Sequence, residues 1–239
     1  MKEIIPLTST VIGSYPTPML NGEEGIKFAV DNQIRAGIDI ISDGQTRKDM
    51  IKYFTDHIPG FTFEDNKIKI IDKIHPPKES PLTKDLEFVK NMIGKEKGLK
   101  GIITGPVTLI ASSKIDKKSP YYSFLDPVLY DDLGEALKKE AELIIKSGID
   151  ILQIDEPFYS VGAPLDLGIR SIKIITENIK IPVGMHVCGN VTKVFEKLVL
   201  FPGIDILSLE FAGSKENFLV IDKRLLEKNS KILGVGCID

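Results

Sequence analysis

The sequence predicts an α/β fold, a TIM (β/α)8 barrel that lacks its eighth strand within the 239 residues. Three observations support this prediction. Short apolar segments alternate with helical patterns, a Gly-Ile-Asp-Ile sequence occurs three times, and polar residues follow most of the apolar segments. A hydrophobic content of 42% and a net charge of −3 suit a large core. We expect residues 1–239 to form one (β/α)8-type catalytic domain, incomplete at its C-terminal end.

The first predicted strand covers residues 8–16 and breaks at Gly13, which leaves Ser14 at its tip. Residues 21–36 then repeat apolar side chains at helical spacing, and Gly37 is placed to end that helix. Strand, turn and helix therefore form the opening unit.

The repeated Gly-Ile-Asp-Ile sequence begins at Gly37, Gly148 and Gly203. Each copy follows a predicted helix and leads through a short apolar run into polar residues, so we expect three equivalent barrel strands. Because the C-terminal ends of barrel strands share one rim, the polar residues after the copies should lie near each other. These residues are Asp43, Gln45, Asp155, Glu156 and Glu210.

A less regular region separates the first two copies. Residues 60–80 read as a short hairpin or excursion over the barrel mouth, ending in a proline-rich stretch that cannot be helical. A helix over 82–97, a strand that ends in Thr-Gly-Pro at 104–106, a polar loop over 112–127 and a helix over 131–147 follow.

After the second copy, helices are expected over 166–179, 191–200 and 215–229. The chain then has seven predicted strands, beginning near residues 8, 38, 100, 149, 181, 204 and 231. A doubly wound open sheet is the alternative. The sequence lacks the Gly-x-Gly-x-x-Gly and Gly-x-x-x-x-Gly-Lys phosphate loops of such sheets, which favours the barrel.

Charge and composition exclude several classes of partner. The 31 basic and 34 acidic residues give no excess positive charge for nucleic acid or for a polybasic membrane patch. A signal peptide and a membrane span are not apparent, so we expect a cytoplasmic protein. In that compartment the two cysteines, Cys188 and Cys237, are expected to be metal ligands or free thiols rather than a disulfide.

His186 and Cys188 stand two residues apart after an apolar approach, so strand alternation directs both side chains to one face. With the Glu210 carboxylate on the same rim, they form a set of one imidazole, one thiolate and one carboxylate. Such a set suits zinc and leaves an exchangeable position for a thiol substrate. The other interpretation is a buried histidine, a core cysteine and a solvated carboxylate.

Asp155 and Glu156 come directly after the strand of the second copy. They could cap the helix that follows, or serve acid/base chemistry. Beside a site that activates a thiol, Asp155 is better placed to hold a substrate ammonium group.

Six motifs resemble the catalytic barrel of cobalamin-independent methionine synthase, in its short single-barrel "core" form. The motifs are Val-Ile-Gly-Ser-Tyr-Pro at 11–16, Asp-Gly-Gln-Thr-Arg-Lys-Asp-Met at 43–50, Thr-Gly-Pro-Val-Thr at 104–108, Gln-Ile-Asp-Glu-Pro at 153–157, His-Val-Cys-Gly at 186–189 and Leu-Ser-Leu-Glu at 207–210. They occur in the family's order and extend over essentially the whole chain.

This resemblance implies transfer of a methyl group to the homocysteine thiol to form methionine, with His186, Cys188 and Glu210 as three zinc ligands. It further implies that Ile12, Gly13 and Ser14 hold the homocysteine carboxylate and that Asp155 meets its amino group. Gln45 stands where the long folate-dependent enzymes have glutamate, so its contact with the amine becomes neutral. The short form implies a methylated corrinoid, often on a carrier protein, as methyl donor; a methyl-pterin is the other candidate.

The family's fourth zinc ligand, a cysteine after the last strand, has no counterpart here. Either the chain continues past Asp239, or Cys237 replaces that ligand, or full activity has been lost; we expect the first. Two other functions stay open: a methylcobalamin:coenzyme M-type thiol methyltransferase, and a catalytically incomplete zinc- or thiol-binding barrel.

Overall fold

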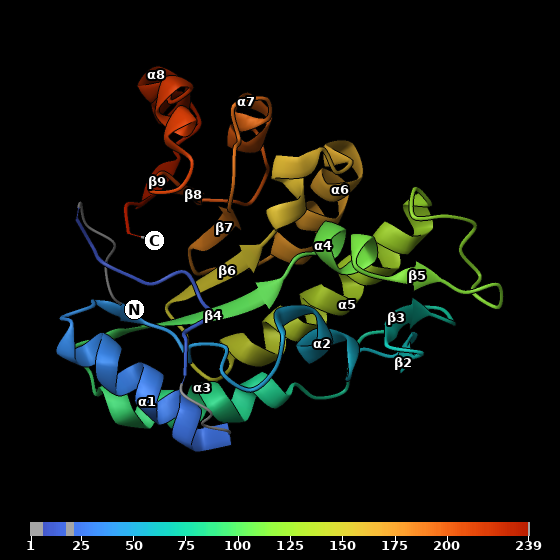
Figure 1. The fold of residues 1–239 in the computed structure, drawn as a ribbon, viewed down its shortest axis with the longest axis horizontal. Helices are drawn as coiled ribbons and strands as arrows, with labels where there is room; N and C mark the ends of the chain where they lie inside the picture. The colour runs from blue at the N-terminus through green and yellow to red at the C-terminus, as the bar shows by residue number, and fades with distance from the viewer. Residues whose placement is uncertain (1–6, 18–21, 239) are drawn as a thin grey trace.

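A computed structural model describes residues 7–17 and 22–238. Six parallel strands form one curved sheet in the order β1-β4-β6-β7-β8-β9, which is also their order in the sequence (Figure 1). This order is that of a barrel that has not closed, and it confirms the predicted fold class. The strands are β1 Ile40–Ile41, β4 Gly98–Thr104, β6 Ile151–Asp155, β7 Val183–Val187, β8 Ile206–Glu210 and β9 Ile232–Gly236.

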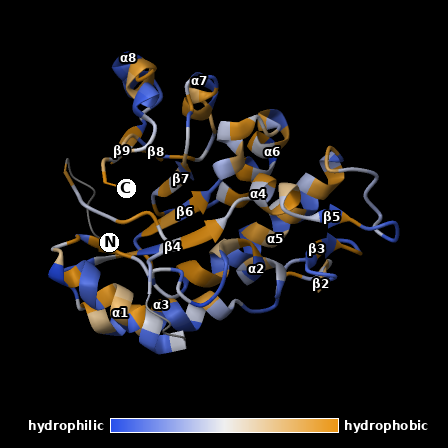
Figure 2. Ribbon diagram, in the orientation of Figure 1, coloured by the Kyte–Doolittle hydropathy of each residue, from blue (hydrophilic) through white to orange (hydrophobic). Residues whose placement is uncertain are grey.

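Helices connect the strands and pack their apolar sides against the sheet, whose central strands β4 and β6 are largely hydrophobic (Figure 2). Four predicted helices are confirmed, with shifted ends. The predicted helix over 191–200 shortens, and the one over 215–229 divides into two. The helices are α1 Gly22–Arg35, α2 Met50–Thr55, α3 Pro81–Ile93, α4 Pro106–Ala111, α5 Pro127–Ile145, α6 Leu165–Thr176, α7 Phe195–Val199 and α8 Lys223–Lys228, with 3-10 turns η1 Pro157–Val161 and η2 Lys215–Leu219.

Each copy of Gly-Ile-Asp-Ile has the same local structure. Its glycine has a positive φ, between 68° and 78°, which lets the chain leave the preceding helix. Its aspartate accepts a hydrogen bond from a backbone N–H at the start of the neighbouring strand or segment. These pairs are Asp39 with Ser9, Asp150 with Leu99 and Asp205 with Val183. The repeat therefore ends a helix and fixes the start of the adjacent chain segment.

The prediction of a first strand over residues 8–16 is wrong. This segment makes only an isolated bridge between Thr10 and Ile40. After Thr10 this segment is hydrogen-bonded to side chains and not to a neighbouring strand. Lys100 and Gln153 both donate to the carbonyl oxygen of Ile12.

The predicted excursion is a small sheet at the end of the molecule opposite β9 (Figure 1). Strands β2 (Phe61–Glu64) and β3 (Lys67–Ile70) form an antiparallel hairpin, which confirms the expectation. The two-residue strand β5 (Lys114–Ile115) pairs with β3, inside the stretch predicted to be a loop.

A buried ion pair connects the turn after α2 to α5. His57 Nε2 lies 3.0 Å from the carboxylate of Glu140, which is fully buried and also accepts from the Ser80 hydroxyl. The other ring nitrogen of His57 faces the carbonyl oxygen of Tyr53 at 3.0 Å. Burial lowers the pKa of His57, but the hydrogen bond to Glu140, the charge of Glu140 and the contact with the Tyr53 carbonyl together outweigh burial, so the pKa is raised.

The last two strands are only partly covered by the residues that the structure describes. The side chains of Ile206, Ser208 and Glu210 on the inner face of β8 are half-buried, whereas Leu207 and Leu209 on its outer face are buried. In the described ranges, no helix is both long enough and apolar enough to cross a membrane.

Candidate functional site

The residues predicted to form the site meet where β6, β7 and β8 end. In the sheet register, Asp155 lies opposite His186, and His186 lies opposite Ser208. The last paired residues of β7 and β8 are Val187 and Leu209, and Cys188 and Glu210 follow them directly in the chain. The structure therefore places these side chains in two adjacent layers on the inner face of the half-barrel, as expected for a TIM-barrel rim.

His186 is held as a neutral imidazole with one free nitrogen. Its Nδ1 lies 3.0 Å from the carbonyl oxygen of Ser208, which can only accept, so Nδ1 carries the hydrogen and Nε2 keeps its lone pair. Burial lowers the pKa of His186 to about 4, and the positive charge of Lys100 adds to this effect. Such a hydrogen bond from the far nitrogen is typical of histidines that bind metals.

Cys188 and Glu210 supply a thiol and a carboxylate next to this imidazole. Burial raises the pKa of the Cys188 thiol, and the nearby carboxylates of Glu210 and Asp155 raise it further. Glu210 accepts a hydrogen bond from the backbone N–H of Gly189 at 2.7 Å. Over the described ranges, no three His, Cys, Asp or Glu side chains already converge closely enough to enclose a metal ion.

Asn217 is a site residue that sequence reasoning missed. This fully buried side chain donates to the carbonyl oxygens of Gly189 and Glu210 at 2.9 and 2.6 Å, and accepts from the N–H of Val191. It thereby ties the exits of β7 and β8 together. Its position within a predicted helix carried no signal of this role.

Asp155 is a buried carboxylate of the site. It is 4% exposed and accepts a hydrogen bond from Gln153 at 2.7 Å. Burial raises its pKa to about 6, which the Gln153 hydrogen bond and the charge of Lys100 only partly offset. It does not cap the following turn, because η1 has no side-chain cap. Asp155 is thus a buried acceptor facing the inside of the barrel.

Glu156 points to the outer side and caps α4, not the helix that follows it in the sequence. Its carboxylate accepts from the N–H groups of Val107 and Thr108, at 2.9 Å each, and from the Thr108 hydroxyl. It lies at the N-terminus of α4, and burial raises its pKa to about 7 despite these hydrogen bonds. The structure gives Glu156 a capping role at α4.

The segment containing Ile12, Gly13 and Ser14 lies beside Gln45. The Ser14 hydroxyl donates to Oε1 of Gln45 at 3.2 Å, and a Cβ atom on Gly13 would come within 2.7 Å of that oxygen. None of the described residues accepts a hydrogen bond from the backbone N–H groups of Ile12 or Gly13. These groups are available to bind an anion such as a carboxylate.

Asp43, on the rim after the first copy of the repeat, is almost fully buried. Burial raises its pKa to about 6, and the negative charge of Asp85 adds to this increase. Asp85 itself is paired with Arg47 at 2.6 Å. A cavity that Asp43 shares with Gln45 and Tyr53 lies against this cluster.

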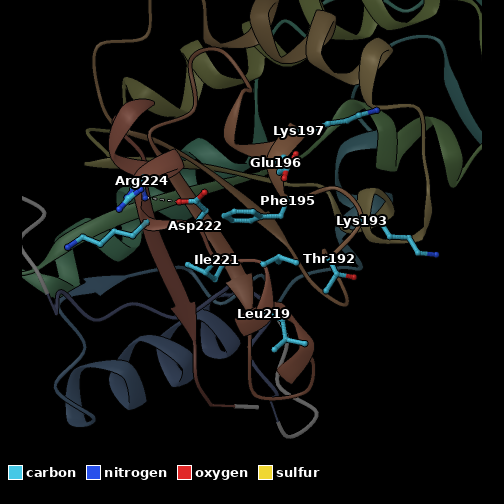
Figure 3. A pocket seen from close by; sticks show the side chains of 11 residues that line it. Thr192, Lys193, Phe195, Glu196, Lys197, Leu219, Ile221, Asp222 and Arg224 are labelled. Carbon is cyan, nitrogen blue, oxygen red and sulfur yellow. Dashed lines mark hydrogen bonds between the residues drawn. The ribbon is translucent and has the colours of Figure 1, made fainter.

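A second hollow, a groove of about 950 Å³, lies between α7 and the segment leading into α8 (Figure 3). Its carboxylate Asp222 accepts from the backbone N–H groups of Arg224 and Leu225 and so caps α8. None of the predicted site residues lines it. We therefore place the functional site on the strand ends and not in this groove.

Comparison with known proteins identifies the family. Residues 20–239 match the family described as cobalamin-independent synthase, catalytic domain. The chain is 36% identical to the methionine synthases of Methanothermobacter marburgensis, over 98% of this chain and 81% of that protein, and of Methanocaldococcus jannaschii, over 98% and 78%. It also superposes on a B12-independent methionine synthase from Shewanella sp. W3-18-1, in complex with selenomethionine, with a TM-score of 0.79 and 26% identity, over 98% of this chain and 80% of that one.

These matches confirm the resemblance predicted from the six motifs. They make the protein a methyltransferase of the methionine synthase type. The chain belongs to the family of cobalamin-independent methionine synthase catalytic domains.

Proposed function

We propose that this chain forms methionine at a zinc site held by His186, Cys188 and Glu210, with a methylated corrinoid, free or on a carrier protein, as methyl donor. The observation that carries the zinc proposal is the hydrogen bond from His186 Nδ1 to Ser208, which leaves Nε2 free to ligate. A thiol and a carboxylate on the neighbouring strand positions complete a donor set of the kind that zinc prefers.

Zinc bound here would act as a Lewis acid that lowers the pKa of the substrate thiol. The three protein ligands fit this role because the rim leaves one side open to the substrate. The Cys188 and Glu210 side chains would have to turn toward His186 for all three to reach one ion. In the transfer itself, the sulfur lone pair forms the new bond to the methyl carbon, and the donor keeps the electron pair of the bond that breaks.

The other end of homocysteine has matching groups in this chain. Its carboxylate would accept from the Ser14 hydroxyl and from the N–H groups of Ile12 and Gly13, which donate to none of the residues that the structure describes. Its ammonium group would meet the buried carboxylate of Asp155, with Gln45 as a neutral neighbour. An ammonium ion near Asp155 offsets the cost of burying that carboxylate as an anion.

Two alternatives make different demands on the same site. A coenzyme M-type methyltransferase would use the same zinc ligands, but its thiol substrate has a sulfonate and no ammonium group for Asp155. A catalytically incomplete barrel would bind zinc or a thiol without turnover. The buried Asp155 favours an amino thiol.

The test is a transfer assay with isotope-labelled methylcobalamin, and in parallel a methyl-pterin, offered to the zinc-loaded protein with homocysteine or coenzyme M. We expect labelled methionine from methylcobalamin. Product from coenzyme M alone would reject the homocysteine assignment, and product from the methyl-pterin alone would reject the corrinoid donor. Zinc retention with no product from either thiol would favour the incomplete barrel.

A further inference from the structure

Lys100 is a buried cation on β4 that the family motifs do not include. It is 2% exposed, and its ammonium group donates to three acceptors: the carbonyl oxygens of Val11 and Ile12, the latter at 3.1 Å, and Oε1 of Gln153 at 2.9 Å. An ammonium group has three N–H donors, so this one is fully used. Lys100 therefore has no donor left for a substrate.

Burying a lysine in a barrel is costly, because its charge loses water that an apolar side chain would not need. Burial accordingly lowers the pKa of Lys100 to about 8, while the carboxylates of Asp155 and Asp43 oppose that decrease. An apolar residue would fill this position at lower cost. The contacts of Lys100 indicate what the charge does, since two of its three partners are consecutive carbonyls of the segment beside the site.

The geometry of the peptide bond connects these contacts to substrate binding. In a trans peptide the C=O and N–H bonds point in opposite directions. When Lys100 holds the carbonyls of Val11 and Ile12, the N–H groups of Ile12 and Gly13 in the same two peptides must face away from it. Gln153 strengthens the arrangement by donating to the Ile12 carbonyl at 2.9 Å and to Asp155 at 2.7 Å.

We propose that Lys100 is a positioning residue that orients two backbone N–H groups of residues 11–13 to receive the carboxylate of the thiol substrate. The inference rests on the proposed function, in which that segment binds the carboxylate of homocysteine. It goes further by assigning carboxylate recognition to a side chain that never touches the substrate.

Lys231 provides a matched control. Its ammonium group also donates to two backbone carbonyls, those of Phe201 and Ile204, and burial lowers its pKa as well. It stands just before β9, at the strand-start end of the half-barrel, and so lies away from the rim. Replacing it removes the same kind of interaction without touching the 11–13 segment.

The test compares Lys100→Met with Lys231→Met, both loaded with zinc, and uses Lys100→Gln if the methionine variant is insoluble. Amide hydrogen exchange is measured first, without substrate, at Ser9 and Tyr15, whose N–H groups are hydrogen-bonded on either side of residues 11–13 and report loosening of this segment. We expect exchange in Lys100→Met to be about tenfold faster there, the effect of losing a charge-assisted hydrogen bond, and unchanged in Lys231→Met. Unchanged exchange in the Lys100 variant would overturn the proposal.

The second measurement compares homocysteine with 3-aminopropane-1-thiol, which has the same thiol and amine but no carboxylate. We expect KM for homocysteine to rise about tenfold in Lys100→Met, with kcat less affected and KM for the aminothiol unchanged. An equal rise for both thiols would show a general structural role and reject the proposal. If the wild-type protein transfers no methyl group, the proposed function fails, and the exchange measurement still decides the role of Lys100.

Discussion

Nδ1 of His186 lies 3.0 Å from the carbonyl oxygen of Ser208 on the next strand, and this contact determines which nitrogen faces the site. The carbonyl is part of the β7–β8 register and cannot donate, so the tautomer of His186 is set by the sheet itself. The inner end of the proposed zinc site is therefore organised by the protein before any metal binds.

Cys188→Ser should abolish zinc retention and leave the fold intact, because a hydroxyl is a much poorer zinc ligand than a thiolate. We expect less than about a tenth of an equivalent of zinc after purification without chelator, measured by metal analysis, and an unchanged circular dichroism spectrum. Cys237→Ser is the control, since Cys237 is an exposed free thiol. Wild-type zinc content in Cys188→Ser would refute the assignment, and a loss in Cys237→Ser would make Cys237 a ligand.

Asn217→Leu should weaken zinc binding although Asn217 is not a ligand. Without its three hydrogen bonds, the exits of β7 and β8 lose their connection, and changes of this kind typically reduce metal affinity by about 10- to 100-fold. Competition with a chromogenic chelator measures the affinity. Asn229→Leu is the comparison, because Asn229 donates to the Leu225 carbonyl at the end of α8. Equal zinc affinities in Asn217→Leu and Asn229→Leu would show that Asn217 does not position the zinc ligands.

Gly105→Ala should destabilise the protein by about 1–3 kcal/mol, because a Cβ atom at this position would overlap the Glu156 carboxyl group. Urea denaturation measures the change in the free energy of unfolding. In Gly184→Ala the new methyl group would make only ordinary contacts, the nearest at 3.7 Å. The explanation is wrong if both alanine variants lose the same stability.

The His57–Glu140 pair should make the free energy of unfolding depend on pH. The pKa of His57 is raised in the folded protein, so its contribution is fully present below the unfolded pKa and is lost as pH rises through the folded pKa. The difference in free energy of unfolding between the wild type and His57→Gln should therefore shrink by on the order of 1 kcal/mol between pH 6 and pH 9. Urea titrations across this range, with the exposed His75→Gln as control, test it. A constant difference between wild type and His57→Gln would contradict the pairing.

Local patterns were sufficient to predict most of the fold. The repeated Gly-Ile-Asp-Ile marks three strand starts because its glycine and its aspartate act on near neighbours in the barrel. Likewise, the spacing of His186 and Cys188 places them on one face through strand alternation alone. These inferences needed no knowledge of distant contacts.

The failures have one physical cause, which is bonding between residues far apart in the sequence. The sequence of residues 8–16 has the pattern of a strand. In the structure, the ammonium group of Lys100, almost 90 residues away, donates to two carbonyl oxygens of this segment. Glu156 had two interpretations from the sequence, a cap on the helix that follows it or an acid/base group, and the structure shows that it caps α4 about 50 residues earlier. Side-chain partners of this kind cannot be read from periodicity.

The cap on α4 also bears on which substrates this barrel can accept. A free helix N-terminus beside the mouth of a barrel is a ready binding place for phosphate groups. Here the Glu156 carboxyl group already accepts hydrogen bonds from the first N–H groups of α4, so these donors are taken by the protein itself. A phosphate group brought to this helix end would find its N–H donors already bonded.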